Sequence, residues 1–419
     1  MANLYNPHIL MFAPACYPPG KPEAFVNSNL ALAMLDAGWS VDVITRPDSS
    51  LWYPSNVNIY ERLAEHMVSI PEIEATLVNK YIQVLKTAVM SGHIASGWQW
   101  ALPAAAAALK HIKHKKFDFI ISRALPQSAH FAALITAKNT GIPWIANWND
   151  PVPWEKFPVE FAGGRGPNAH LDYKTSRFFK AVSMKADWHT FPCERLRTYV
   201  ADYLPVDIGL KSSVIPHIAM QSNEISSERN IKFKLLYAGS LISPRSPDIF
   251  LKGVSLFCER YKTRDLEIVF IVDSYEEVLK SAEKYGVIDL VKIEPSRPYA
   301  EMNSILNTAD VLVIIEAIMH EGIFLPSKFV DYVQTGKPIL ALSPVSGTLS
   351  DILNGVGGGL TVDNSSADDI SEGILKLYQH WSKGTLNNMF GSNRLLKTFS
   401  TETILSQYLQ VFNNITKGG

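Results

Sequence analysis

A run of polar side chains in the second half of the chain has the types and spacing needed to hold a nucleoside diphosphate. Pro326 and Ser327 indicate the start of a helix, so Lys328 falls in its first turn. A cation there is unfavourable to the helix dipole unless an anion lies nearby, and Ser327 and Lys328 can bind phosphate together. Asp331 follows three residues later on the same helix face, where it can accept hydrogen bonds from ribose hydroxyls. The alternative is a surface ion pair between Lys328 and Asp331.

Two turns between a strand and a helix offer further ligand contacts. In the second half, Gly239 ends an apolar strand, and Arg245 precedes Pro247, a good first residue for a helix. A guanidinium beside helix amides suits a diphosphate, and the alternative is a solvated loop arginine. In the first half, Gly20 lies in a Pro-rich loop before a helix that opens near Glu23. This loop either approaches a ligand or is a plain connection, and it lacks the G-x-G-x-x-G pattern of dinucleotide sites.

A third segment combines acidic and aromatic residues at the end of an expected strand. Asn149 and Asp150 follow this strand, and ligands bind at such strand ends in parallel sheets. Asp150 can orient or deprotonate an acceptor hydroxyl, and its alternative is a turn-forming residue before Pro151. Three tryptophans either stack on sugar rings or fill the core: Trp144, Trp148 and Trp154.

The other candidate residues are histidines and lysines. His130 is interpreted as a packed or capping residue of a helix, and the alternative is a catalytic role. One basic cluster is either a solvated helix end or a contact with an anionic membrane surface: Lys110, His111, Lys113, His114, Lys115 and Lys116. The sequence contains no D-x-D, and its cysteines and histidines lack the spacing of metal ligands, so no bound metal is expected.

The composition is that of a globular protein without a general affinity for polyanions. The 419 residues are 47% hydrophobic and 19% charged, and the formal net charge is −1, so no nucleic-acid partner is expected. Cys16, Cys193 and Cys258 are far apart, which suits a reducing cytosol. No signal peptide is recognised, and the longest apolar stretch, 94–109, is shorter than the roughly 20 residues of a membrane span. We therefore expect a cytoplasmic protein, peripheral at the inner face of the cell membrane if the basic cluster binds lipid.

Short apolar runs alternate with helical patterns along the chain. The expected strands span residues 8–15, 40–45, 117–122, 143–148, 188–192, 234–240, 266–273, 290–294, 310–315, 338–343 and 359–362. The expected helices span residues 23–37, 127–139, 247–261, 275–285, 299–308, 327–334 and 367–381. This alternation predicts parallel sheets covered by helices on both faces.

The length suits two domains, and the polar segment 221–230 marks the expected boundary. We expect an N-terminal domain at 1–222, a C-terminal domain at 223–392, and a helical segment at 393–419 that packs back on the N-terminal domain. Residues 61–116 are mostly helical in pattern and interrupt the alternation in the first domain.

These residues resemble those of the glycosyltransferases with the GT-B fold, and among them family four, the retaining enzymes of polysaccharide and glycolipid assembly. The resemblance covers nearly the whole chain and is strongest in two stretches: Leu325-Pro-Ser-Lys-Phe-Val-Asp-Tyr with Gly336-Lys-Pro, and Gly141-Ile-Pro-Trp-Ile-Ala-Asn-Trp-Asn-Asp-Pro with Pro126-Gln-Ser-Ala-His upstream. It implies an α/β fold with two Rossmann-like, doubly wound domains facing a central cleft.

The resemblance also implies roles for residues of the second domain. Asp331 stands at the second acid of a Glu–seven residues–Glu motif, which binds the donor ribose, and Ser327 and Lys328 approach the donor diphosphate. Glu321 is the best match for the first acid, which contacts the transferred sugar. Nine residues separate Glu321 from Asp331, so Glu316 is an alternative first acid.

Other positions match the family in part. Gly20 matches the donor-side loop of the first domain, and Asp150 matches an acid on the acceptor side of the cleft. Many members have Gly-Arg-Leu after the first strand of the second domain and a lysine a few residues on. Here Gly239 is followed by Ser240 in place of that arginine, and Arg245 stands near the lysine position.

The function implied is a retaining, metal-independent transfer of a sugar from a UDP- or GDP-linked donor to a glycan or lipid-linked acceptor, in the biosynthesis of a cell-surface polysaccharide such as lipopolysaccharide or capsule. The nucleotide-sugar is a co-substrate, and no other cofactor is expected. Two alternatives are a degenerate GT-B scaffold subunit of a polysaccharide assembly complex and a nucleotide-sugar 2-epimerase. A dinucleotide oxidoreductase is more distant, since no G-x-G-x-x-G follows an expected strand.

Overall fold

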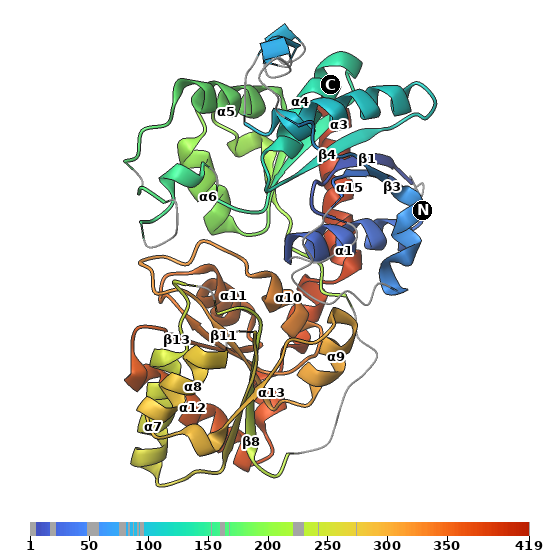
Figure 1. Cartoon of the computed structure of the whole chain (residues 1–419). Coiled ribbons are helices and arrows are strands. Elements are labelled where there is room, and N and C mark those ends of the chain that lie inside the picture. The colour runs from blue at the N-terminus through green and yellow to red at the C-terminus, as the bar shows by residue number, and fades with distance from the viewer. Residues whose placement is uncertain are drawn as a thin grey trace. The chain divides into compact units, whose positions relative to one another are not determined.

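The computed structural model describes most of the chain as two compact units (Figure 1). The described residues are 6–16, 22–47, 58–74, 81–82, 84–86, 88–89, 92, 96–151, 153–159, 164–166, 168–220, 230–241, 243–273 and 275–418. Unit 1 comprises Met1–Phe157, Gly163–His217 and Ile404–Gly419, and unit 2 comprises Pro158–Ala162 and Ile218–Thr403.

The division differs in detail from the predicted domains. It follows residue 217 and not residue 222, and the C-terminal segment 393–419 is shared, with 393–403 in unit 2 and 404–419 in unit 1. The prediction used the polar stretch 221–230, of which only residue 230 is described. Polar composition marks a surface connection, but it does not show at which residue the chain leaves one core for the other.

Unit 1 is built on a parallel sheet that has seven strands in its described part, in the order β3-β2-β1-β4-β5-β6-β7. The strands are β1 (His8–Phe12), β2 (Ser40–Thr45), β3 (Met67–Ser69), β4 (Phe119–Ala124), β5 (Trp144–Trp148), β6 (Trp188–Phe191) and β7 (Ser212–Val214). The central strands β1, β4 and β5 are buried along nearly their whole length, because helices cover both faces of such a sheet. The strand order reverses between β1 and β4, and the carboxyl ends of these strands flank the point where doubly wound sheets bind ligands.

The described helices of unit 1 cover this sheet. They are α1 (Pro22–Asp36), α3 (Trp98–Ile112), α4 (Ser128–Thr140), α5 (Tyr173–Lys185), α6 (Glu194–Tyr203) and the part of α15 (Thr401–Gly418) from Ile404 onward, with the 3-10 helices η1 (Asn58–His66), η2 (Trp154–Lys156) and η3 (Gly209–Lys211). In α15, Phe412 stacks on Phe119 of β4, with ring centroids 4.2 Å apart. The last helix of the chain is therefore part of the core of unit 1.

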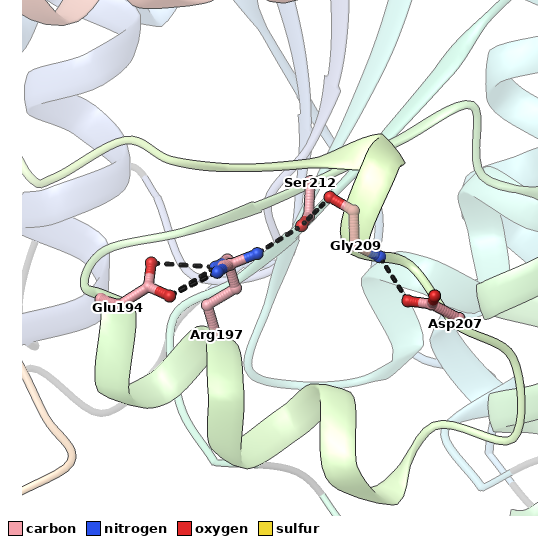
Figure 2. Close-up of polar contacts among 5 residues, drawn as sticks. All are labelled: Glu194, Arg197, Asp207, Gly209 and Ser212. Atoms are coloured by element: carbon pink, nitrogen blue, oxygen red, sulfur yellow. Dashed lines mark hydrogen bonds and ion pairs between the residues drawn. The ribbon is translucent and has the colours of Figure 1, made fainter.

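Side chains tie the edge strand β7 to helix α6, as Figure 2 shows. Arg197 pairs with Glu194 one turn earlier in α6, and its Nε lies 2.9 Å from Oε2 of Glu194. The same guanidinium donates through Nη1 to the hydroxyl of Ser212, 3.2 Å away, at the first residue of β7. In the preceding turn, Asp207 accepts a hydrogen bond from the Gly209 amide at 2.7 Å. The short strand is thus held by a helix as well as by β6.

Unit 2 is built on a second parallel sheet, with six strands in its described part, in the order β10-β9-β8-β11-β12-β13. The strands are β8 (Phe233–Ala238), β9 (Leu266–Ile271), β10 (Val291–Glu294), β11 (Val311–Ile315), β12 (Ile339–Ser343) and β13 (Gly359–Asp363). The described helices are α7 (Asp248–Tyr261), α8 (Tyr275–Lys284), η4 (Ile288–Leu290), α9 (Tyr299–Asn307), α10 (Ser327–Val333), α11 (Thr348–Val356), α12 (Ala367–Ser382), α13 (Leu386–Phe390) and α14 (Asn393–Thr398). The strand order reverses between β8 and β11.

Helices α7 and α12 lie side by side against the sheet of unit 2 (Figure 1). They approach closely at Gly253, where a Cβ atom would lie 2.5 Å from Cγ2 of Ile370. Aromatic rings fill the space beneath them, and Phe233 of β8 packs against Trp381 with centroids 5.5 Å apart. This packing fixes β8, whose carboxyl end carries candidate residues.

The sequence predicts the fold class correctly, because every expected strand has a counterpart and both sheets are parallel. Strands β3 and β7 are additional. Each has only three residues, which is too short for a recognisable apolar run. Each is identified as a strand by its pairing with the neighbouring strand, β2 or β6. Within the segment 61–116, residues 67–69 form the strand β3, which pairs with β2. Among the described residues, no helix combines the length and apolar character that crossing a membrane requires.

Candidate functional site

The best-defined candidate site lies in unit 2, where the strand order reverses between β8 and β11. Gly239 and Ser240 follow β8, Glu316 follows β11, and helix α10 begins with Ser327 and Lys328. The structure therefore brings together residues from three separated segments of the chain. All of them lie at the carboxyl edge of one parallel sheet, the edge at which such sheets bind ligands.

Lys328 is the central cation of this site. Its ammonium lies against the backbone of Gly239, where a Cβ atom would be 2.8 Å from Nζ. The ammonium donates to the Tyr237 hydroxyl at 3.0 Å and lies 4.1 Å from the centroid of the Tyr237 ring. Burial lowers the pKa of Lys328 to about 7, and the charge of Arg245 acts in the same direction, while Asp331 and Glu316 oppose them. A bound anion would reverse this effect by stabilising the charged form.

Two tyrosines that the sequence analysis did not single out position Lys328. The hydroxyl of Tyr237 donates to the carbonyl of Ser240 at 3.0 Å. This hydrogen bond holds the turn that follows β8. The hydroxyl of Tyr332 accepts from the Ala238 amide at 2.9 Å and donates to the Ala238 carbonyl at 3.3 Å. Helix α10 is thereby fixed to the end of β8. No local spacing in the sequence links these two tyrosines. Only the fold reveals their contacts with the residues at the end of β8.

Glu316 is the acid that the structure places beside the cations. It is 7% exposed and accepts a hydrogen bond from the hydroxyl of Ser343. Burial raises the pKa of Glu316 to about 7, although Ser343, Arg245 and Lys328 all act to lower it. Glu316 also lines a pocket with residues from the turn before α7 and the end of β13, among them Pro244, Ser246 and Asn364.

Glu321 has a different position. Its side chain is exposed, and the next residue, Gly322, passes close to Glu316, with a Cβ position 3.6 Å from Glu316 Oε2. Asp331 accepts a hydrogen bond from the Tyr299 hydroxyl at 2.7 Å, and burial raises the pKa of Asp331 to about 6. The structure therefore favours Glu316 over Glu321 as the acid near the cations, and it leaves Asp331 one helical turn away from Lys328.

The close approach at Gly239 makes a testable prediction about stability. Gly239 has a φ of +121°, which side chains rarely adopt, so Gly239→Ala strains the backbone and displaces the Lys328 ammonium. We expect a loss of about 1–3 kcal/mol in the free energy of unfolding, measured by urea denaturation. Gly355→Ala is the matched control, because its Cβ would meet nothing within 4 Å. Equal stability of the two variants would contradict the geometry described for Gly239.

Unit 1 has its own polar cluster, around the ends of β4 and β5. Asn149 donates to Oε1 of Glu23 at 2.6 Å, and Asn27 donates to the same oxygen at 3.1 Å. Asp150, the predicted acceptor-side acid, lies close enough that its charge raises the pKa of Glu23. In the sequence, Glu23 marks only the expected start of a helix. The Glu-x-x-x-Asn spacing of Glu23 and Asn27 was a weak signal, since residues four apart share a helix face.

Several other predicted residues take structural roles. Trp144 and Trp148 are fully buried, and their indole N–H groups donate to Ser122 at 2.7 Å and to His189 at 3.1 Å, so they belong to the core. His130 is also fully buried, and its Nδ1 lies 2.8 Å from the Ser122 hydroxyl, which agrees with a packed histidine. The prediction for Gly20 falls outside the described residues, and the side chain of Trp154 is outside them too.

The basic cluster is only in part a solvated helix end. Lys115 lies 2.6 Å and His111 lies 3.1 Å from Oδ2 of Asp42, which is 6% exposed. Lys110, Lys113 and the other two members are exposed. Across the described residues, no group of three or more histidines, cysteines and acids is arranged to hold a metal ion.

Comparison with known proteins relates this arrangement to solved structures. No protein-family model matches the chain, and no curated protein sequence gives a significant match. The chain is similar to a glycosyltransferase from Rickettsia africae, with a TM-score of 0.67, 12% identity, and coverage of 99% of this chain and 100% of that one. It is similar to Alr3699/HepE of Anabaena in complex with UDP, with a TM-score of 0.68, 12% identity, and coverage of 97% and 100%.

A third similar structure is the sucrose-phosphate synthase of Thermosynechococcus elongatus, with a TM-score of 0.62, 13% identity, and coverage of 99% of this chain and 100% of that one. The likeness extends over nearly the full length of each pair of chains, although few residues are identical. The fold that the sequence predicts is thus confirmed: the chain has the two-unit α/β fold of the GT-B glycosyltransferases.

Proposed function

We propose that this chain is a glycosyltransferase whose unit 2 binds a nucleotide-sugar. One observation carries the proposal: the Lys328 ammonium is buried against the backbone of Gly239 at the end of β8, with Arg245 near enough to lower its pKa. Two cations whose charges act on each other in a partly buried place favour a ligand with two negative charges, such as a diphosphate. The structures of Alr3699/HepE with UDP, with UDP and glucose, and with UDP-glucose support this class of donor.

In the proposed reaction, Lys328 and Arg245 stabilise the charge that develops on the departing diphosphate. The bond from the sugar C1 to the phosphate oxygen breaks, the acceptor oxygen bonds to C1, and the acceptor proton passes to the departing phosphate. The two side chains supply the positive charge at this point, so we propose that the transfer needs no metal ion. We further propose that Asp331 binds the ribose hydroxyls and that Glu316 contacts the transferred sugar.

Unit 1 has the acceptor role in this proposal, with Asp150 orienting the reacting hydroxyl. The sequence resemblance supports retention of configuration at C1 and a glycan or lipid-linked acceptor in polysaccharide assembly. A cytoplasmic protein near the inner face of the membrane fits such an acceptor, and the exposed members of the basic cluster are the residues that would contact lipid headgroups.

A thermal-shift screen against UDP, GDP, ADP, CMP and their common sugars, with and without EDTA, tests this proposal. We expect one nucleotide family to raise the melting temperature equally with and without chelator. A ligand at 100 times its Kd adds roughly 2.7 kcal/mol to the free energy of unfolding, which gives an easily measured shift. No shift with any nucleotide would favour the scaffold-subunit alternative, and a shift that EDTA abolishes would contradict metal independence.

A further inference from the structure

The polar cluster of unit 1 lies at the carboxyl edge of that unit's own parallel sheet. Glu23 and Asn27 belong to α1, Arg123 lies near the end of β4, and Asn149 and Asp150 follow β5. These residues come from the segments on either side of the strand-order reversal between β1 and β4. Parallel sheets bind ligands at this edge, so the cluster is placed to touch a second substrate.

A chain of hydrogen bonds fixes the orientation of Glu23. Arg123 donates from Nε to Oδ1 of Asn27 at 2.6 Å, so the amide nitrogen of Asn27 is the group that faces Glu23. That nitrogen donates to Oε1 of Glu23 at 3.1 Å and to the carbonyl of Ala15 at 2.7 Å. Asn149 donates to the same Glu23 oxygen at 2.6 Å. Oε1 of Glu23 accepts both hydrogen bonds, so neither of them uses the second carboxyl oxygen, Oε2.

Asn149 provides an independent sign of a missing partner. Its side chain is 8% exposed, and its nitrogen is used by Glu23, but its carbonyl oxygen has no hydrogen-bond partner. A buried acceptor without a donor is costly, and native structures usually satisfy such groups. The unpartnered oxygen belongs to the same amide that touches Glu23, so a hydroxyl entering the cluster could donate to it.

The two carboxyl groups differ from ordinary surface acids. Burial raises the pKa of Asp150, and burial together with the charge of Asp150 raises the pKa of Glu23. Arg123 and the two asparagine amides act in the opposite direction on Glu23. Near neutral pH such a coupled pair tends to hold one proton, which gives one hydrogen-bond donor and one charged acceptor in the same cluster. A sugar hydroxyl, which both donates and accepts, is the matching group.

We propose that Glu23 and Asp150 together bind hydroxyl groups of a neutral, polyhydroxylated acceptor, and that the pair disfavours acceptors carrying phosphate or carboxylate at this point. This inference rests on the proposed acceptor role of unit 1. An anionic group would meet two carboxyl oxygens, and like charges repel strongly where water is excluded. Arg123 does not donate to a ligand through Nε, because its side chain is 3% exposed and its Nε is held by Asn27.

Saturation-transfer difference NMR tests the inference without a nucleotide. The probes are the methyl glycosides of glucose, mannose, galactose and N-acetylglucosamine, each paired with its 6-phosphate. We expect at least one neutral glycoside to bind the unmodified chain at least about tenfold more tightly than its 6-phosphate. Glu23→Gln and Asp150→Asn should each weaken that neutral glycoside about 10- to 100-fold, a loss typical of a hydrogen bond to a charged group.

The double variant E23Q/D150N removes both carboxyl groups and should lose the discrimination against the 6-phosphate. Glu194→Gln is the matched control, since Glu194 is an exposed acid of unit 1 that pairs with Arg197. It should leave both the binding and the discrimination unchanged. The inference fails if no neutral glycoside binds, if the 6-phosphates bind as well as the neutral forms, or if the double variant still discriminates.

The nucleotide thermal shift, repeated on the same variants, separates this inference from the proposed function. A nucleotide shift without glycoside binding would overturn the acceptor inference and leave the donor site in place. Glycoside binding that depends on Glu23 and Asp150, without any nucleotide shift, would support this site while overturning the donor proposal.

Discussion

Replacing Lys328 with methionine is expected to lower turnover about 10²- to 10³-fold, the usual cost of removing one group that stabilises charge in a transition state. Methionine keeps the apolar stem over the Tyr237 ring and removes only the ammonium, which now lies 4.1 Å from the ring centroid. The fold should survive, because the variant no longer buries a cation. Steady-state kinetics with the donor found by thermal shift measures the effect.

The pH dependence of donor binding provides a second measurement on the same variant. Because burial lowers the pKa of Lys328 to about 7, the ammonium of the free protein loses its proton as the pH rises through this value. The affinity for a nucleotide-sugar, whose diphosphate stays ionised, should fall above pH 7 by at most about tenfold per pH unit. K328M should bind weakly and should lose the part of this decline that the Lys328 ammonium causes.

Lys252→Met is the matched control for both measurements. Lys252 is an exposed lysine of α7 in the same unit, so its loss should leave turnover and the pH profile unchanged. Unchanged turnover in K328M, or equal losses in K328M and K252M, would exclude Lys328 from the reaction.

Glu316→Gln is expected to lower kcat/KM by about 10- to 100-fold, which corresponds to the loss of one hydrogen bond to a charged group. Glutamine retains an oxygen that can accept the Ser343 hydroxyl, so the expected loss arises from the missing negative charge beside Arg245 and Lys328. The same change at the exposed Glu321 should lower kcat/KM by no more than about threefold, within the usual effect of a surface substitution.

Comparison of these two variants decides which acid, Glu316 or Glu321, contacts the transferred sugar, a choice that the sequence left open. If Glu321→Gln has the larger effect, the exposed acid must move to the substrate on binding, and the arrangement described for Glu316 is not the reactive one. Melting temperatures of both variants show whether either loss is a folding defect, because an unfolded variant would also lose its cooperative transition.

Most of the fold can be predicted from the sequence, because a buried parallel strand is recognisable from the residues of that segment alone. Strand β2, for example, begins and ends at the predicted residues, Ser40 and Thr45. Strand β7 has only Val214 as an apolar residue, and its place depends on β6 and on Arg197. Such elements follow from tertiary contacts, which residue periodicity does not contain.

Contacts within the candidate site could likewise not all be predicted from the sequence. Lys328 and Asp331 were found because one helix turn joins them, and Gly239 because it ends a strand. The contacts of Tyr237 and Tyr332 depend on how α10 meets β8, which no local spacing reveals. Glu316 and Glu321 could not be ranked from sequence either, because both follow β11 and only the path of the backbone buries one and exposes the other.

The two outer strands of the unit 1 sheet bear on how the protein behaves at high concentration. Strands β3 and β7 have three residues each, and they close the sheet at its two described edges. A sheet edge offers unpaired N–H and C=O groups to other chains, and a longer edge gives a longer template for aggregation. Each edge here presents only a three-residue ladder. The short strands thus disfavour edge-to-edge growth of fibrils from the folded protein.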